Sequence, residues 1–231
     1  MIKIRTGVQT GQTHNKNGGI LHYLLFLPAK YGVDDQESWP LVMFLHGIGE
    51  RGSSQSTLSS LKKYGPPKMV EEDQDFPCVV VSPQCPSDSY WFEHLDLLES
   101  LCKEIVETLH VDNQRIYLTG LSMGGYGTWH FGLRFPDRCA ALVPIAGGYM
   151  HESREIPETI CGLSHVPIWA FHGSADTVVL PYQTEILVEA LQECGSSVRY
   201  TLLDGADHGQ SWEQAYADPE MWSWMLSQRK E

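Results

Sequence analysis

Short runs of apolar residues alternate along the chain with longer segments in which apolar residues recur every three or four positions. The runs at 40–46 and 78–82 (PLVMFLH and CVVVS) are nearly continuous, which is typical of strands buried on both faces of a parallel sheet. Residues 95–110 repeat apolar side chains at helical steps, which predicts a helix. This alternation favours a mostly parallel sheet covered by helices on both faces.

The rest of the chain continues the same alternation. Further strands are expected at 21–27, 115–119, 140–146, 168–172 and 197–203. Further helices are expected from the glycine-rich segment at 120–125 to about 135, at 181–194 and at 219–228. Since no repeat, low-complexity tract or linker interrupts the pattern, we expect one domain over residues 1–231. The segment 147–165 is too short for a large cap domain.

Composition and charge exclude several partners. The 231 residues carry a formal net charge of −13, and nucleic-acid binding depends on clustered Lys and Arg. The same charge disfavours docking on anionic membranes. No apolar run approaches the length of a membrane span. The chain lacks metal-ligand spacing and a nucleotide-binding loop, so we expect no metal and no cofactor.

The six cysteines bear on the compartment. None forms a CxxC pair, and the N-terminus shows no apolar run of the kind found in signal peptides. We therefore expect reduced thiols and a cytoplasmic protein. Pairing of two cysteines remains open if the chain comes from a longer precursor.

The strongest chemical signal is the pentapeptide GLSMG at 120–124, which matches the G-x-S-x-G nucleophile elbow. A strand pattern precedes it and a helix pattern follows, as the elbow requires. Small residues at 120 and 124 would let the chain turn sharply, and Ser122 would sit at a helix N-terminus. The alternative is a glycine-rich turn with a capping serine.

A serine hydroxyl needs a base, and the base needs an orienting acid. His208 follows the last predicted strand and Asp176 the strand before it, so the order Ser122, Asp176, His208 matches that of α/β-hydrolases. Asp204 and Asp207 are alternative acids because they lie nearer to His208 in sequence. His208 could also be a solvated loop residue.

An acyl-transfer site also needs two N–H donors for the developing oxyanion. Met123, directly after the nucleophile, is one candidate. The other is Ile48, with Gly49 second, in the loop HGIGERG at 46–52. A plain glycine turn is the alternative, and His46 is expected to hold the loop rather than to act in catalysis.

The motifs together resemble a known family. They are HGIGERG at 46–52, SPQCP at 82–86 with Trp91, DNQRIYLTGLSMGGYGTW at 112–129, FHGSAD at 171–176 and HGQSW at 208–212. They are similar to bacterial α/β-hydrolases of the phospholipase/carboxylesterase ("predicted peptidase") group, near the polyhydroxybutyrate-depolymerase-like and feruloyl-esterase-like enzymes. Gly209 departs from the polar residue expected after the histidine.

The resemblance implies a single-domain α/β-hydrolase fold and places further residues around the substrate. Gln84, Trp91, Gly147 and Gly148 would border the pocket. For Trp91 the alternative is ordinary core packing. Trp212 could pack over the site or lie in the core.

The expected function is hydrolysis of short-chain or aromatic carboxylic esters through an acyl-enzyme. A peptidase or amidase acting through the same three residues is a second hypothesis. A non-catalytic ligand-binding protein is a third. The expected partner is a small-molecule ester, and the sequence does not indicate an oligomeric state.

Overall fold

A computed structural model describes residues 2–34 and 38–230; the two ends of the predicted domain, residues 1 and 231, lie outside them. Its centre is one eight-stranded sheet in the order β1-β2-β4-β3-β5-β6-β7-β8. The first two strands pair antiparallel, and β2 also pairs antiparallel with β4. All other neighbours are parallel. The strands are β1 (Gln9–Lys16), β2 (Gly19–Phe26), β3 (Trp39–Leu45), β4 (Val79–Pro83), β5 (Val111–Leu121), β6 (Ala141–Ile145), β7 (Trp169–Gly173) and β8 (Arg199–Leu203).

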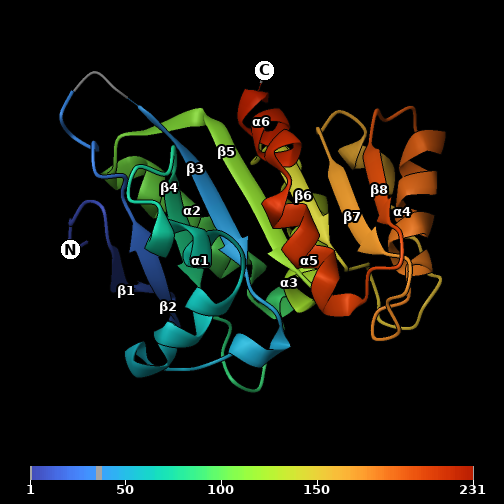
Figure 1. The fold of residues 1–231 in the computed structure, drawn as a ribbon, viewed down its shortest axis with the longest axis horizontal. Helices are drawn as coiled ribbons and strands as arrows, with labels where there is room; N and C mark the ends of the chain where they lie inside the picture. The colour runs from blue at the N-terminus through green and yellow to red at the C-terminus, as the bar shows by residue number, and fades with distance from the viewer. Residues whose placement is uncertain (1, 35–37, 231) are drawn as a thin grey trace.

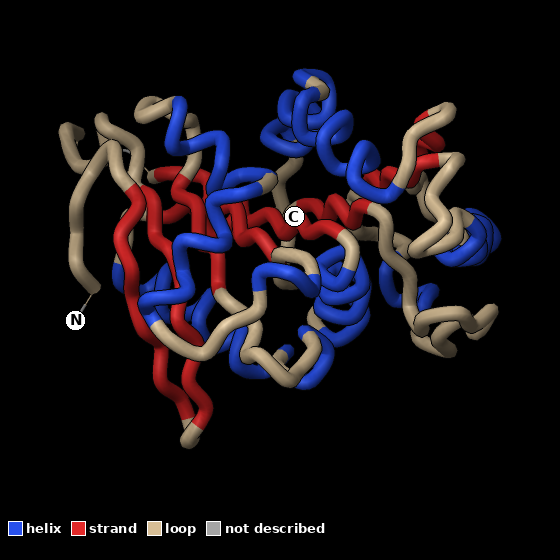
Figure 2. Tube along the Cα trace, turned by 60° about the horizontal axis from the view of Figure 1, so that its bottom comes forward, coloured by secondary structure: helices blue, strands red, loops and turns tan. Residues whose placement is uncertain are grey.

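Helices cover both faces of this sheet (Figures 1 and 2). One face packs against α2 (Leu95–Thr108), α3 (Met123–Arg134) and α4 (Tyr182–Glu193). The other packs against α1 (Gly65–Glu72), α5 (His208–Ala217) and α6 (Pro219–Ser227). The central strands are buried throughout because apolar side chains from both faces enter a helix–sheet core. The predicted α/β architecture is confirmed.

Three elements depart from the sequence prediction. Strand β1 was missed because its residues, QTGQTHNK, are almost all polar. Helices α1 and α5 were also missed, because neither shows a strong apolar repeat. Helix α1 begins with the residues GPP, and α5 has the sequence HGQSWEQAYA. The loop between β6 and β7 contains only the short 3-10 helix η4 (Ile160–Leu163) among its described elements, so no cap domain covers the sheet there.

A disulfide joins Cys161, in η4, to Cys194, just after α4, with Cα atoms 5.3 Å apart. The expectation of reduced thiols is therefore wrong for this pair. The packing of η4 against the end of α4 brings together two residues 33 positions apart, a proximity that spacing does not reveal. The four free cysteines, Cys78, Cys85, Cys102 and Cys139, are buried. The predicted cytoplasmic location loses its support from reduced thiols.

In the described part of the chain, no helix combines the length and apolar character needed to cross a bilayer.

Candidate active site

A strained turn carries Ser122 from the end of β5 into the first turn of α3. The backbone of Ser122 has φ 53° and ψ −119°, a conformation that side-chain-bearing residues adopt only where their surroundings enforce it. A Cβ at Gly124 would lie 1.9 Å from the Leu45 carbonyl oxygen, and one at Gly120 would lie 2.3 Å from that of Gly124. Glycine is therefore required at both positions, as the pentapeptide predicts.

The structure brings together the three residues predicted as a triad. Ser122 Oγ lies 2.9 Å from His208 Nε2, and His208 Nδ1 lies 2.6 Å from Asp176 Oδ2. Because a carboxylate only accepts, His208 carries its proton on Nδ1, and Nε2 is left to accept from the serine hydroxyl. His208 begins α5 and Asp176 follows β7, so both approach from the carboxyl edge of the parallel strands.

Asp176 accepts from three donors and faces a second histidine. Its Oδ1 accepts from the N–H groups of Val178 and Val179, each at 2.9 Å. Its Oδ2 lies near both His208 and His172, the latter at 3.2 Å. Burial would raise the pKa of this carboxyl, but the nearby His172 ring and the hydrogen bonds from His208 and Val179 outweigh burial and hold its pKa well below the ordinary value. Asp176 therefore stays ionised beside the imidazole.

His172 lies near the end of β7 and contacts the turn that carries Asp176, as its position in the sequence predicts. It is fully buried, and its Nε2–H donates to the Val179 carbonyl at 2.8 Å as well as facing Asp176. The approach of its ring to the Asp176 carboxylate is the part that the sequence did not reveal.

The alternative acids have other positions. Asp207 is the N-cap of α5, where its carboxylate accepts from the Gln210 N–H at 2.8 Å in a capping box. Asp204 is exposed in the turn after β8. The structure therefore joins Asp176, not these neighbours, to the His208 ring.

The candidate oxyanion donors lie at two helix starts beside Ser122. Met123 is the first residue of α3, and Ile48 is the first of the 3-10 helix η1 (Ile48–Glu50). The N–H at a helix start has no acceptor within its own helix. The preceding Gly47 packs on the elbow, since a Cβ there would lie 2.9 Å from a Leu121 methyl. The second choice, Gly49, sits one residue further along η1 in open space.

His46 holds this loop as a neutral ring. Its Nδ1–H donates to the Gly47 carbonyl at 2.6 Å, and its Nε2 accepts from the Cys85 N–H at 2.9 Å. Burial lowers the pKa of His46 to about 4. The expected supporting role therefore matches its contacts.

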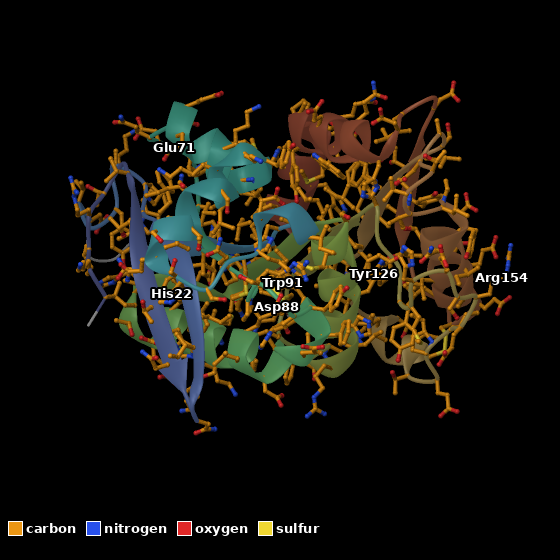
Figure 3. The ribbon with its side chains drawn as sticks, turned by 90° about the horizontal axis from the view of Figure 1, so that it is seen from below. His22, Glu71, Asp88, Trp91, Tyr126 and Arg154 are labelled. Carbon is orange, nitrogen blue, oxygen red and sulfur yellow. A yellow bond between two sulfur atoms is a disulfide. The ribbon has the colours of Figure 1, made fainter. Side chains whose placement is uncertain are left out.

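Gln84 and Trp91 require a correction. Both are 1% exposed, so neither borders a pocket as the resemblance implied. Gln84 donates to the Glu50 carbonyl at 2.8 Å, and the Trp91 indole N–H donates to the His46 carbonyl at 3.0 Å. Residues after a strand end can face the neighbouring loop instead of the substrate, and these two hold the loop 46–50 from beneath. Figure 3 looks onto this carboxyl edge, with Trp91 near its centre.

The remaining predicted pocket residues surround the elbow differently. Trp212 is half-buried, and its ring meets that of His208 edge-on with centroids 4.9 Å apart, so it forms a wall beside the imidazole. Gly147 and Gly148 are buried. A Cβ at Gly147 would lie 2.5 Å from Gly125 in α3, and one at Gly148 would lie 2.9 Å from Gln183. These glycines let the chain after β6 pass close to the elbow.

Within residues 2–34 and 38–230, no group of three or more His, Cys, Asp or Glu side chains is arranged to hold a metal ion.

Known proteins resemble the chain over most of its length. A poly(3-hydroxyoctanoate) depolymerase of Pseudomonas fluorescens is 26% identical over 191 residues, covering 74% of this chain and 68% of the depolymerase. The solved structure of a thermostable esterase has a TM-score of 0.79 at 31% identity, over 96% of this chain and 63% of the esterase. The chain thus spans only about two thirds of either protein.

A feruloyl esterase module from Clostridium thermocellum, complexed with sinapinate, shares the fold. Its TM-score is 0.71 at 17% identity, over 90% of this chain and 85% of the module. A family model described as phospholipase/carboxylesterase matches residues 74–218, a span that includes Ser122, Asp176 and His208. The chain has the α/β-hydrolase fold and belongs to the phospholipase/carboxylesterase family.

Proposed function

We propose that the protein is a serine carboxylesterase in which Ser122 is the nucleophile, His208 the base and Asp176 the orienting acid. The observation that carries this proposal is the continuous hydrogen-bonded chain from Ser122 Oγ through His208 to the buried Asp176 carboxylate. Membership of a carboxylesterase family supports the reaction class. The strained elbow at Ser122 supports the choice of nucleophile.

The mechanism follows from these contacts. Ser122 Oγ attacks the ester carbonyl carbon while its proton passes to His208 Nε2, and Asp176 stabilises the resulting imidazolium. The carbonyl oxygen becomes an oxyanion that accepts from the N–H groups of Met123 and Ile48. His208 then protonates the departing alcohol, which leaves an acyl-enzyme at Ser122. Water attacks this ester with His208 again as base, and the acid and free enzyme are released.

The proposed substrate class rests on the carboxyl edge of the sheet, where no cap domain lies between β6 and β7 among the described residues. With only loops and the short helix η4 between β6 and β7, no large lid encloses a long chain. Ile48 is exposed and Trp212 flanks His208, so both offer apolar surface beside the reacting carbon. We therefore assign short-chain or aromatic acyl esters as substrates. A depolymerase of a polyester and a feruloyl esterase among the similar proteins are consistent with ester chemistry.

The test is a hydrolysis profile over 4-nitrophenyl esters of increasing acyl length, with methyl ferulate and a 4-nitroanilide in parallel. The proposal expects turnover of acetyl to butyryl esters or of methyl ferulate, and stoichiometric labelling of Ser122 by a serine-directed phosphonate. Cleavage of the anilide at a comparable rate would favour a peptidase. Phosphonate labelling at another residue would overturn the assignment of the nucleophile.

A further inference from the structure

A row of neighbouring aromatic rings, of which Tyr90 and Phe92 are stacked and exposed, runs from Arg51 to Tyr149. Arg51 lies over the Tyr90 ring, with its guanidinium carbon 5.6 Å from the centroid. The Tyr90 and Phe92 rings are nearly parallel, 5.6 Å apart and 9° between planes. Phe92 continues to His130 at 5.6 Å, and His130 continues to Tyr149 at 4.7 Å. The mechanism proposed above uses none of these side chains.

The two central rings are exposed and rigidly mounted. Tyr90 is 42% exposed and Phe92 49%, whereas Trp91 between them is 1% exposed. Trp91 is anchored by its hydrogen bond to the His46 carbonyl and by packing on Gly127 of α3. Because the middle residue points inward, its neighbours are held outward. Large aromatic side chains held on a surface are typical of binding sites.

The ends of the row are also fixed. Arg51 donates from Nε to the Ile48 carbonyl at 3.2 Å and from Nη1 to the Ser89 carbonyl at 3.2 Å, which ties the row to the candidate oxyanion loop. At the other end, His130 Nε2–H donates to the Tyr149 carbonyl at 2.8 Å. Burial lowers the pKa of His130, so this ring is neutral at neutral pH.

The row lies within reach of a substrate bound at Ser122. His130 lies about two helical turns beyond Ser122 along α3, and Tyr126, labelled near Trp91 in Figure 3, is about one turn beyond Ser122. At 1.5 Å per residue, Gly127 beneath Trp91 is roughly 8 Å along the helix from Ser122, and His130 roughly 12 Å. A substrate that extends beyond its reacting ester by about this length would reach the row.

The chemistry of the row favours a pyranose chain. A single exposed aromatic contact contributes only about 1 kcal/mol, so an open row gains useful affinity from a repeating ligand. A pyranose ring presents a C–H face to an aromatic ring and hydroxyls at its rim, where the Arg51 guanidinium can donate. The protein's net charge of −13 disfavours an anionic polymer.

We propose that Tyr90 and Phe92, flanked by Arg51 and by His130 with Tyr149, form a subsite for the sugar rings of a neutral saccharide that carries the ester. This inference rests on the proposed esterase function for its place in the reaction. Saccharide binding itself requires no turnover, so the two proposals can fail separately.

Binding is tested with xylohexaose and cellohexaose, titrated calorimetrically into the Ser122→Ala protein. We expect the Ser122→Ala protein to bind at least one of the two oligosaccharides. Adding Tyr90→Ala and Phe92→Ala should raise the dissociation constant about tenfold or more, because each lost ring contact weakens binding by up to about a factor of ten. Ile20→Ala and Leu202→Ala, at comparably exposed apolar positions, are controls that should leave binding unchanged. Matching melting temperatures would show that the exposed substitutions leave the fold intact.

Turnover is tested with the wild-type nucleophile, on 4-nitrophenyl acetate and on acetylated xylo-oligosaccharide. Tyr90→Ala with Phe92→Ala should raise KM for the oligosaccharide about tenfold while kcat/KM for 4-nitrophenyl acetate stays within about twofold. Equal losses on both substrates, or no binding of either hexasaccharide, would overturn the subsite. Tributyrin is assayed in parallel, and a loss confined to tributyrin would overturn the saccharide subsite in favour of an apolar surface for the acyl chain. If Ser122→Ala binds sugar but the wild type cleaves no ester, the esterase proposal fails and the subsite stands.

Discussion

The Nδ1 atom of His46 lies 2.6 Å from the carbonyl oxygen of Gly47, the residue directly after it. In a planar trans peptide the C=O and the following N–H point in opposite directions. The hydrogen bond that holds the Gly47 carbonyl therefore also fixes the direction of the Ile48 N–H. The ring needs its proton on Nδ1 for this, and the Cys85 N–H at Nε2 selects that tautomer.

The buried neutral His46 predicts a loss of stability in acid. Burial lowers its pKa from 6.5 to about 4 in the folded protein. As the pH falls below 6.5, His46 becomes protonated in the unfolded chain, whereas in the folded protein it stays neutral until about pH 4. The free energy of unfolding should thus fall by about 3 kcal/mol across this window from this group alone. Urea midpoints measured across the window give the slope.

The control for that slope is His46→Gln, which cannot titrate and should unfold with a flatter pH dependence. His151→Gln, at an exposed position, accounts for the loss of one histidine. A slope in His46→Gln as steep as in the wild type would contradict a buried neutral ring at this position.

Ser122→Ala should abolish ester hydrolysis, with kcat falling on the order of 10⁵-fold or more, as for other serine nucleophiles. The side chain is partly exposed and fills no core volume, so the melting temperature should stay close to that of the wild type. Hydrolysis of 4-nitrophenyl acetate and phosphonate labelling are the measurements. Retained turnover in a folded variant would show that another residue is the nucleophile.

Asp176→Asn should lower kcat on the order of 10⁴-fold, because the amide cannot stabilise the imidazolium or hold the Nδ1–H tautomer. Asp207→Asn is a matched control, since asparagine caps a helix about as well as aspartate and the carboxylate at 207 serves α5. Its kcat should change little. If Asp207→Asn proved the crippling change, the identity of the acid would be wrong.

Local sequence patterns predicted most of the strands and helices and the elbow at Ser122. They failed for features that depend on how distant segments pack together. The strand, turn and helix around Ser122 could be predicted because the apolar periodicity, the glycine spacing and the G-x-S-x-G motif agree within one segment. Gln84 and Trp91 were misplaced because a position after a strand end does not reveal which way a side chain faces. The Cys161–Cys194 pair depends on packing between η4 and α4, which no local pattern encodes.

The disulfide should stabilise the fold without touching the reaction. It closes a loop between residues 33 positions apart, for which about 2–4 kcal/mol is expected. Cys194 lies at the far end of α4, about 18 Å along that helix from its start. Cys161→Ser with Cys194→Ser should lower the unfolding free energy by that amount and leave kcat unchanged.

Reductant should bring the wild type down to the stability of this double variant and leave the variant itself unaffected. Thiol titration of the unfolded, unreduced protein should find four free cysteines. Six would contradict the pairing.

Substitution of two buried tryptophans distinguishes two effects on catalysis: the hydrogen bond to the loop 46–50 and packing in the core. Trp91 and Trp129 are both fully buried, but the Trp91 N–H donates to the His46 carbonyl, whereas that of Trp129 has no partner among the described residues. Trp91→Phe should therefore lower kcat several-fold, the change that corresponds to the loss of one hydrogen bond. The rate of phosphonate labelling of Ser122 should fall by a similar factor. Trp129→Phe should lower stability through lost volume and leave kcat unchanged. Equal effects on kcat would mean that packing alone, and not the hydrogen bond to the loop, supports catalysis.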